Sequence, residues 1–206
     1  MRYYLANFSV FILILMANKA FCNEMTLNEL FFDDSKPYYL KVLDALPESA
    51  IIAIGPEDAE NTIIEFMDYF CGYCKKIHPE LISITEKRED TRVIYLQHPI
   101  LSESSNLIAK MVIAANLQGK GWDLHHGLFT VKGSLTQQKL DQIIIDSEIN
   151  KTKLMIDMGK DEIDNTVKLS SFLAMGSGAR GTPALFINEE FVGGYLPLEQ
   201  LESLLK

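Results

Sequence analysis

The sequence has very few cysteines. Only three occur among 206 residues, at positions 22, 71 and 74. A secreted protein that uses disulfides as staples spreads its cysteines over long loops, whereas the one close pair here spans only four residues. Because the stabilisation from a disulfide grows with the length of the loop that it closes, this pair would add little to stability. The scarcity excludes a disulfide-stapled scaffold and predicts a pair that reacts.

The sequence also lacks an excess of positive charge. It has 19 Lys and Arg residues against 28 Asp and Glu residues, which gives a formal net charge of -9. Nucleic acid is therefore not expected as a partner, because there is no basic stripe to replace its counterions. A hydrophobic content of 48% with 23% charged residues is typical of a globular protein. The length fits one domain, or one domain that carries an insertion.

An apolar run near the N-terminus predicts a secretory signal peptide over residues 1–22. Arg2 gives a positive start, and residues 8–17 are almost all apolar. The run is too short to span a bilayer, which takes roughly 20 apolar residues. Cleavage is expected after Cys22 or two residues earlier, and a lipid anchor on Cys22 is an alternative that the bulky Phe21 disfavours. Removal of this segment takes away two cations and no acid, changes the net charge from -9 to -11, and leaves the close pair as the only cysteines.

The remaining chain divides into four segments by its expected secondary structure. The first is expected to be helical, and it either packs on the domain's own core or forms an oligomerisation segment. Strands are expected on both sides of an entirely helical block, and a compact helical insertion into an α/β frame explains this order. The four are a helical segment 23–50, a first α/β part 51–101, a helical insertion 102–176 and a second α/β part 177–206.

The chain is organised around Cys71-Gly72-Tyr73-Cys74. Residues 62–70, just before the pair, are mostly apolar, β-branched or aromatic, which predicts a buried strand, and helix formers follow. A helix N-terminus offers unpaired N–H groups and the positive end of the helix dipole. Both favour the thiolate, which is the reactive form of cysteine. We expect Cys71 to be exposed and to form the bond with substrate, and Cys74 to be buried, with a raised pKa, and to resolve mixed disulfides.

Several motifs together resemble the thioredoxin superfamily. The run from Cys71 to Pro79 is similar to a thioredoxin active site, and Glu65 stands where relatives hold a buried acid. Residues 180–183, Arg-Gly-Thr-Pro, resemble the family's cis-proline loop, which packs against the cysteine pair. The helical insertion before that loop is similar to the DsbA-like branch, the exported bacterial dithiol oxidases. The resemblance implies a thioredoxin fold with an inserted all-helical subdomain, a periplasmic location and reoxidation by a membrane partner of the DsbB type.

Two further positions are expected to modulate the pair. Glu65 could pass a proton to or from Cys74, and a carboxylate that faces the sheet edge is the alternative. The Thr182–Pro183 bond can be cis, because an X–Pro bond pays only about 0.5–1 kcal/mol for it. The backbone of Thr182 could then pair with an extended substrate, since proline presents no N–H there.

The dipeptide Gly72-Tyr73 between the cysteines is expected to tune the redox potential. Strongly oxidising DsbA proteins carry a histidine there, whereas this dipeptide has no cation. The resemblance therefore implies a less acidic Cys71 and a potential between about -120 and about -230 mV. Gly-Tyr also occurs in periplasmic disulfide isomerases, so the motif alone leaves oxidase and isomerase open.

A metal or haem cofactor is not expected, and the redox-active disulfide is the only reactive group. His78 follows Cys74 at a spacing that could suit zinc, but no second pair completes a tetrahedral site, so a histidine on the surface or beside the site is expected. Lys75 stands where haem attachment needs a histidine. The pair His125-His126 has no anchoring pattern. Residues expected to pack in the core rather than to bind a ligand are Trp122, Met111, Met155, Met158 and Met175.

The sequence thus predicts an exported thiol–disulfide oxidoreductase that introduces disulfides into folding proteins with free thiols through Cys71 and Cys74. One alternative is a disulfide isomerase or reductase that oligomerises through residues 23–50, so the oligomeric state is open. Another is a non-catalytic metal-binding or chaperone module.

Overall fold

The computed structural model describes residues 36–206. The predicted signal peptide and residues 23–35 of the expected helical segment lie outside the described residues. Within the rest of that segment, the structure has the helix α3 (Tyr38–Ala45) and the 3-10 turn η2 (Glu48–Ala50). Pro37 occupies the N-cap of α3, one residue before the first helical position, where proline is most frequent.

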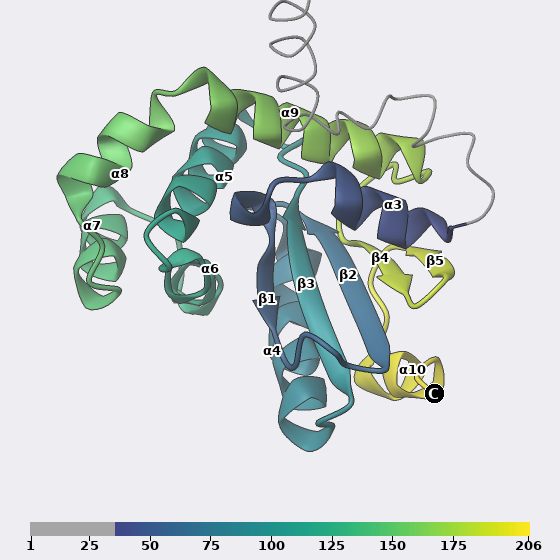
Figure 1. Cartoon of the computed structure of the whole chain (residues 1–206). Coiled ribbons are helices and arrows are strands. Elements are labelled where there is room, and N and C mark those ends of the chain that lie inside the picture. The colour runs from purple at the N-terminus through teal and green to yellow at the C-terminus, as the bar shows by residue number, and fades with distance from the viewer. Residues whose placement is uncertain (1–35) are drawn as a thin grey trace, which may run out of the picture. The chain divides into compact units, whose positions relative to one another are not determined.

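A five-stranded mixed sheet lies at the centre of the described residues (Figure 1). The strand order is β1-β3-β2-β4-β5; β2 and β3 are parallel, and the other neighbours are antiparallel. Central strands are buried on both faces, which explains why β2 and β3 read as nearly continuous apolar runs. The hairpin between the last two strands turns at Asn188 and Glu189, and the φ of 54° at Asn188 suits asparagine. The strands are β1 (Ile52–Ile54), β2 (Asn61–Met67), β3 (Thr91–Gln97), β4 (Ala184–Ile187) and β5 (Glu190–Gly193).

One helix links β2 to β3, and a block of five helices separates β3 from β4 (Figure 1). Side chains of Ser102, Thr136 and Asn150 cap three of the five by accepting a bond from the backbone N–H three residues on, which fixes where those helices begin. The described part of this block contains no strand, as the sequence predicts. The helices are α4 (Gly72–Lys87), α5 (Glu103–Asn116), α6 (Gly121–Thr130), α7 (Gln137–Asp146), α8 (Lys151–Met158), α9 (Asp161–Gly176) and the closing α10 (Leu198–Ser203).

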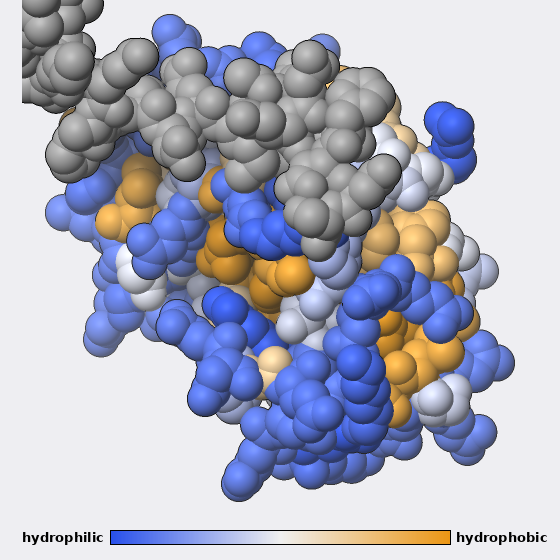
Figure 2. Space-filling view, turned by 45° about the vertical axis from the view of Figure 1, so that its right-hand side comes forward, coloured by the Kyte–Doolittle hydropathy of each residue, from blue (hydrophilic) through white to orange (hydrophobic). Residues whose placement is uncertain are grey.

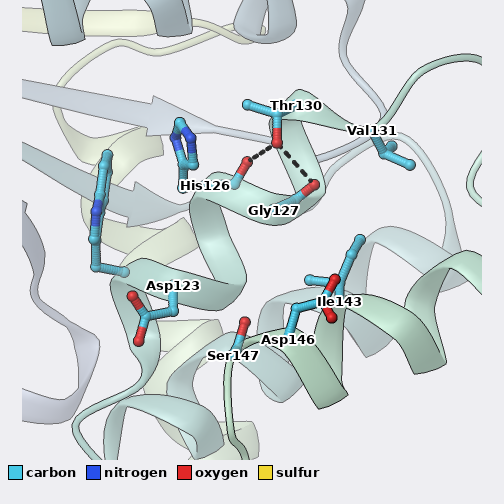
Figure 3. A pocket seen from close by; sticks show the side chains of 9 residues that line it. Asp123, His126, Gly127, Thr130, Val131, Ile143, Asp146 and Ser147 are labelled. Atoms are coloured by element: carbon cyan, nitrogen blue, oxygen red, sulfur yellow. Dashed lines mark hydrogen bonds between the residues drawn. The ribbon is translucent and has the colours of Figure 1, made fainter.

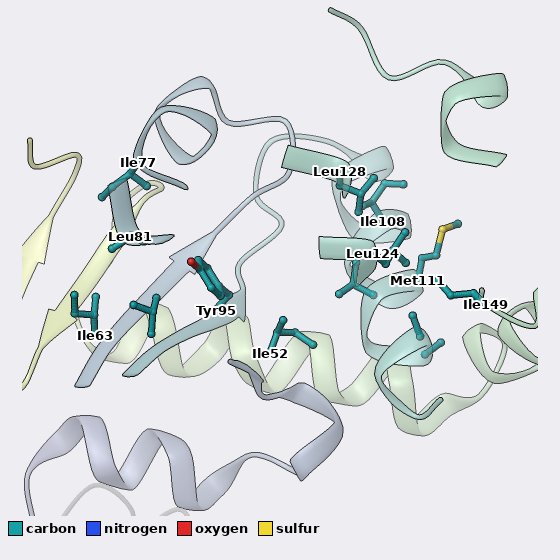
Figure 4. Packing of buried hydrophobic residues seen from close by; sticks show 14 of the residues in the cluster. Ile52, Ile63, Ile77, Leu81, Tyr95, Ile108, Met111, Leu124, Leu128 and Ile149 are labelled. Carbon is teal, nitrogen blue, oxygen red and sulfur yellow. The ribbon is translucent and has the colours of Figure 1, made fainter. Parts of the chain in front are cut away.

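A large hydrophobic core joins the sheet, α4 and the helical block (Figure 4). It runs from Ile63 on β2 and Leu81 on α4 through Tyr95 on β3 to Leu124 on α6. The α6 helix therefore rests directly on the sheet side that carries Tyr95, and it forms part of the surroundings of α4.

Two of the methionines predicted to lie in the core do not. Met111 is buried and Met158 packs against the core, but Met155 and Met175 are more than half exposed because they lie on the outer faces of α8 and α9. Hydrophilic residues cover most of the face shown in Figure 2, and hydrophobic residues reach the surface there in patches. Within residues 36–206, no helix has the length and apolarity needed to cross a membrane.

Candidate active site

The cysteine pair lies at the N-terminus of α4, directly after the carboxyl end of β2. Cys71 is the N-cap residue, and its sulfur accepts a bond from the backbone N–H of Cys74 at 3.5 Å. Asp68 shapes the turn before it, because its backbone carbonyl accepts from the Cys71 N–H at 3.0 Å and its carboxylate accepts from the Phe70 N–H at 2.8 Å. The predicted position of the pair at the start of a helix is confirmed. Both side chains are free thiols in this structure.

Cys71 is less exposed than the sequence suggested. Only 8% of its surface is accessible, because it packs against Met67, Phe129 and Tyr69 as well as its partner cysteine. The expectation of an exposed sulfur was wrong because the sequence does not show where the helical block packs. Its helix α6 supplies Phe129, which covers Cys71. A substrate thiol must therefore reach a sulfur that is largely covered.

The site favours the thiolate at Cys71. Hydrogen bonding from the Cys74 thiol is the main cause that lowers the pKa of Cys71 to about 5, and burial opposes it. The Thr182 side chain and the backbone N–H groups of Cys74 and Tyr73 lower this pKa further. At neutral pH the sulfur is therefore mostly ionised.

Cys74 lies three residues further along the chain and has the opposite property. It is fully buried, and burial is the largest cause that raises its pKa; the hydrogen bond to Cys71 and the nearby Glu65 carboxylate raise it further. The thiol form is therefore strongly preferred at Cys74. The pair combines an ionised outer sulfur with a protonated inner one.

Glu65 lies in the middle of the sheet, beneath the pair. It is fully buried on β2, with Tyr95 on β3 and Leu185 on β4 as its register partners. The alternative of an edge-facing carboxylate was wrong, since β2 is a central strand. Burial raises the pKa of Glu65 well above its ordinary value, while the neighbouring Cys74 thiol lowers it less. The carboxyl group is thus held close to its neutral form beside the inner thiol.

The loop before β4 completes the site. The Thr182–Pro183 peptide bond is cis, and the Thr182 carbonyl oxygen lies 3.1 Å from the Cys71 sulfur. Residues 111 positions apart in the sequence thus meet because β4 pairs with β2. Thr182 and Pro183 lie where the sequence motif predicts, against the cysteine pair.

The residues between the cysteines face outward. Gly72 is exposed with open space around it, and Tyr73 is 61% exposed. The Tyr73 ring lies 5.9 Å from the Tyr195 ring, and the Lys76 ammonium lies 4.0 Å above that second ring. Beside Cys71, a surface pocket of about 380 Å³ is lined by Tyr69, Phe70, Cys71, Gly72, Lys75, Leu128, Val131, Gly133, Ser134 and Leu135.

A group of histidines and tyrosines behind the pair is the feature that the sequence did not predict. His78 was expected on the surface or beside the site, but it is only 2% exposed, and α6 brings His125 and His126 against it. The helical spacing of His78 after Cys74 was the only available signal, because the partners lie on a distant helix. Among the described residues, no group of His, Cys, Asp and Glu is arranged to hold a metal ion. We call this group the tyrosine–histidine cluster: Tyr69, His78, Tyr95, His125 and His126.

Comparisons with known proteins agree with this arrangement. The family model described as "DSBA-like thioredoxin domain" matches residues 62–206. The catalytic domain of ScsC from Proteus mirabilis is 29% identical, with a TM-score of 0.70 over 81% of this chain and 93% of that one. A thioredoxin-like oxidoreductase from Silicibacter pomeroyi DSS-3 is 26% identical, with a TM-score of 0.71 over 77% of this chain and 91% of that one.

A curated relative is much longer than this chain. The Na(+)/H(+) antiporter NhaA of Herminiimonas arsenicoxydans is 22% identical over 152 residues, which is 74% of this chain but 24% of that protein. The chain thus spans about a quarter of the length of that relative.

Proposed function

The chain belongs to the DSBA-like thioredoxin domain family, and from this membership we propose that it is a thiol–disulfide oxidoreductase that introduces disulfides into folding proteins. The observation that carries the proposal is the opposite ionisation of two sulfurs three residues apart. The pKa of Cys71 is lowered to about 5, mainly by the Cys74 thiol, and the pKa of Cys74 is raised, mainly by burial. A sulfur that is stable as a thiolate is a good leaving group, and at neutral pH it is present in the form that attacks disulfides, although its intrinsic nucleophilicity falls with its pKa.

In the proposed reaction the oxidised protein receives electrons from a substrate. A substrate thiolate attacks the Cys71 sulfur, the bond between Cys71 and Cys74 breaks, and the electron pair goes to the Cys74 sulfur, which takes up a proton. A second substrate thiolate then attacks the substrate sulfur of the mixed disulfide, and Cys71 leaves as a thiolate. The substrate gains a disulfide, and the protein ends with one thiolate and one thiol.

The ionised Cys71 favours oxidation of substrate over reduction. Every interaction that stabilises the thiolate stabilises the reduced protein relative to the disulfide, which raises the reduction potential. The sulfur is held by the N-terminus of α4 and by Thr182, and neither depends on a cation between the cysteines. This supports an oxidase rather than a reductase.

The surroundings of Cys71 suit an extended polypeptide. The Thr182 backbone lies beside the sulfur, and an extended substrate can pair with it as a strand pairs with a sheet edge. The pocket next to Cys71 adds apolar side chains such as Leu128 and Leu135, and Phe70 is 45% exposed. Unfolded proteins present apolar side chains of this kind, whereas folded ones bury them.

The location and reoxidation partner are part of the same proposal. An oxidase of this type works after export, in a periplasm that keeps disulfides formed. The signal-like sequence at residues 1–22 supports export. The reduced pair would then be reoxidised by a membrane protein of the DsbB type.

The proposal is tested by the oxidation of reduced, unfolded ribonuclease. We expect the oxidised protein to restore ribonuclease activity, and the Cys71→Ser variant to restore none. The alternatives give different results. An isomerase restores activity to scrambled ribonuclease, and its mass by light scattering is that of an oligomer. A chaperone keeps its holdase activity in the Cys71→Ser variant. A protein that fails to oxidise the reduced substrate would refute the proposed function.

A further inference from the structure

The tyrosine–histidine cluster begins directly beside Glu65. Glu65 and Tyr95 are register partners on the neighbouring strands β2 and β3, so their side chains leave the same face of the sheet. That face is covered by α4 and α6, since Tyr95 lies against His78 of α4 and His125 of α6. In Figure 4 the Tyr95 side chain stands within the core between the sheet and these helices. The carboxyl group therefore has polar neighbours on the side away from substrate.

Ring contacts and hydrogen bonds connect the cluster inside the protein. The Tyr95 and His125 ring centroids are 4.2 Å apart, and the Tyr69 hydroxyl is 2.9 Å from His125 Nδ1. The His125 and His78 centroids are 5.1 Å apart, and His78 Nε2 is 3.2 Å from His126 Nδ1. These contacts make a continuous series from the sheet to α6.

Polar atoms without partners lie along this series. A buried polar atom without a hydrogen bond is destabilising, and internal water commonly binds such atoms. Among the described residues, the buried side-chain atoms that lack a partner include both Glu65 carboxylate oxygens, the Tyr95 hydroxyl, His125 Nε2 and His78 Nδ1. These atoms are therefore positions along the series at which internal water can bind.

The far end of the series reaches the surface. His126 is only partly buried and lines a pocket of about 420 Å³ together with Asp123 and Ser147 (Figure 3). The Thr130 hydroxyl in this pocket bonds to the backbone carbonyls of His126 and Gly127, which leaves the imidazole bonded to His78. Solvent thus contacts one end of the cluster, and Glu65 lies at the other.

We propose that the tyrosine–histidine cluster conducts protons between Glu65 and the solvent at His126. The inference rests on the proposed function and adds a route for its proton. When substrate breaks the Cys71–Cys74 bond, the Cys74 sulfur keeps the electron pair and takes the proton of the Glu65 carboxyl group. The resulting carboxylate takes a proton from the cluster, and His126 takes one from water, so one proton enters for each disulfide reduced. Cluster residues act through Glu65 and are positioning residues.

The ionisation of the cluster is compatible with this role. Burial is the main cause that lowers the pKa of His78 to about 3 and that lowers the pKa of His125 well below its ordinary value. Both rings are therefore neutral at physiological pH. A neutral imidazole accepts on one nitrogen and donates from the other, and a tyrosine hydroxyl does both, so each member can pass a proton on.

The test variant is Tyr95→Phe, which removes only the unpartnered hydroxyl. The phenyl ring keeps the packing of the tyrosine, and no hydrogen bond to a described protein group is lost. Oxidised protein is mixed in a stopped-flow instrument with an excess of an aryl thiol that is already ionised at the assay pH, so the proton for Cys74 must come from solvent. Fluorescence of Trp122, the only tryptophan, follows the sulfur chemistry, and a pH-indicator dye follows proton uptake.

In the wild-type protein, proton uptake and disulfide reduction should coincide. In Tyr95→Phe, the rate of proton uptake should fall to about a tenth of the rate of disulfide reduction. This factor is smaller than the full contribution that proton transfer by side chains makes to enzymatic rates. The difference between the two rates should grow in D2O. The matched control is His98→Gln: His98 is also 2% exposed, but it bonds to Ser171 outside the cluster, and its variant should show no lag.

A second variant tests whether slow proton uptake in Tyr95→Phe comes only from a local change around the tyrosine. His126→Gln at the solvent end should also delay proton uptake and leave the rate of mixed-disulfide formation unchanged. If uptake coincides with reduction in both cluster variants, the inference is refuted while the proposed function stands. If the wild-type protein does not react with the thiol at all, the proposed function fails first.

Discussion

The outer and inner parts of the active site act on the same chemical group in opposite ways. At the outer part, the Cys71 sulfur accepts a hydrogen bond at the start of α4, and its pKa falls to about 5, first because of the Cys74 thiol and further because of the Thr182 side chain. At the inner part, Cys74 is surrounded by apolar side chains and Glu65, and its pKa rises, first because of burial. At Cys71 the hydrogen-bond donors lower the pKa by more than burial raises it. At Cys74, three residues away, burial has the larger effect. The different reactivity of the two sulfurs thus follows from the different hydrogen bonding and burial at two positions one helical turn apart.

The largest test of this comparison replaces each sulfur in turn. Cys71→Ser should abolish disulfide exchange, a loss of at least about 1,000-fold, because the only ionised sulfur is gone. Cys74→Ser, mixed with a substrate that contains a disulfide, should still form the first bond: the Cys71 thiolate attacks one substrate sulfur, the other leaves as a thiolate, and the mixed disulfide accumulates because Cys74 is no longer there to resolve it. Mass spectrometry of the trapped species distinguishes the two variants. Trapping through Cys74 in the Cys71→Ser variant would reverse the assignment of the two sulfurs.

The next test changes the inner part alone, through Glu65→Gln. We expect proton transfer at Cys74 to slow by about a hundredfold, because an amide cannot exchange a proton with the thiol. Stability at neutral pH should rise by about 1–3 kcal/mol, since a buried ionisable group is removed. Stopped-flow kinetics and urea unfolding measure the two effects. Glu189→Gln, the same change at an exposed position, is the control and should alter neither.

The sign of the pH dependence follows from the raised pKa of Glu65. The unfolded carboxyl group releases its proton near pH 4.3, whereas burial keeps it protonated in the fold to higher pH. Between those values the folded state binds more protons, so this group lowers stability as the pH rises. The wild-type and Glu65→Gln unfolding curves should therefore coincide below the unfolded pKa and separate above it. Curves that stay parallel across this range would contradict the assignment.

A pH effect of the opposite sign belongs to the outer part. The pKa of Cys71 is about 5 in the fold, lowered mainly by the Cys74 thiol, against about 8.5 in an unfolded chain. In the reduced protein this group therefore adds stability above the unfolded pKa and loses it as the pH falls through 5. The gain relative to Cys71→Ser should be on the order of 3 kcal/mol. The oxidised protein, which has no thiol to titrate, should not show it.

The two parts also differ in how far the sequence alone could describe them. The outer part is local: residues 62–79 carry the strand, the cysteine pair and the helix, and β2 and α4 form where their residues predict. The thioredoxin fold with a helical insertion follows from the same motifs and is confirmed. Thr182 was found only because its neighbour is a proline in a motif of the family.

The inner part depends on packing between distant segments, and periodicity does not encode such packing. His125 and His126 belong to α6, and nothing in their own neighbourhood indicates that they meet His78. The same helix buries Cys71 by way of Phe129, which is why the expected exposure of that sulfur was wrong. Contacts between an insertion and the fold that carries it can be identified only when the position of the insertion in the structure is known.

The smallest expected effect concerns the dipeptide between the cysteines. Tyr73→His places an imidazole near the Cys71 thiolate, and its protonated form should stabilise that thiolate. Because Tyr73 is 61% exposed, solvent and salt screen the interaction, and we expect the reduction potential to rise by only about 30 mV, which corresponds to about 1.4 kcal/mol. Equilibration with glutathione measures the shift, and Tyr73→Phe is the control for loss of the hydroxyl. The rise should grow at a pH below the imidazole pKa and shrink in high salt. A shift of several times this size would mean that the exposed dipeptide, and not the fixed donors of α4 and Thr182, sets the acidity of the outer sulfur.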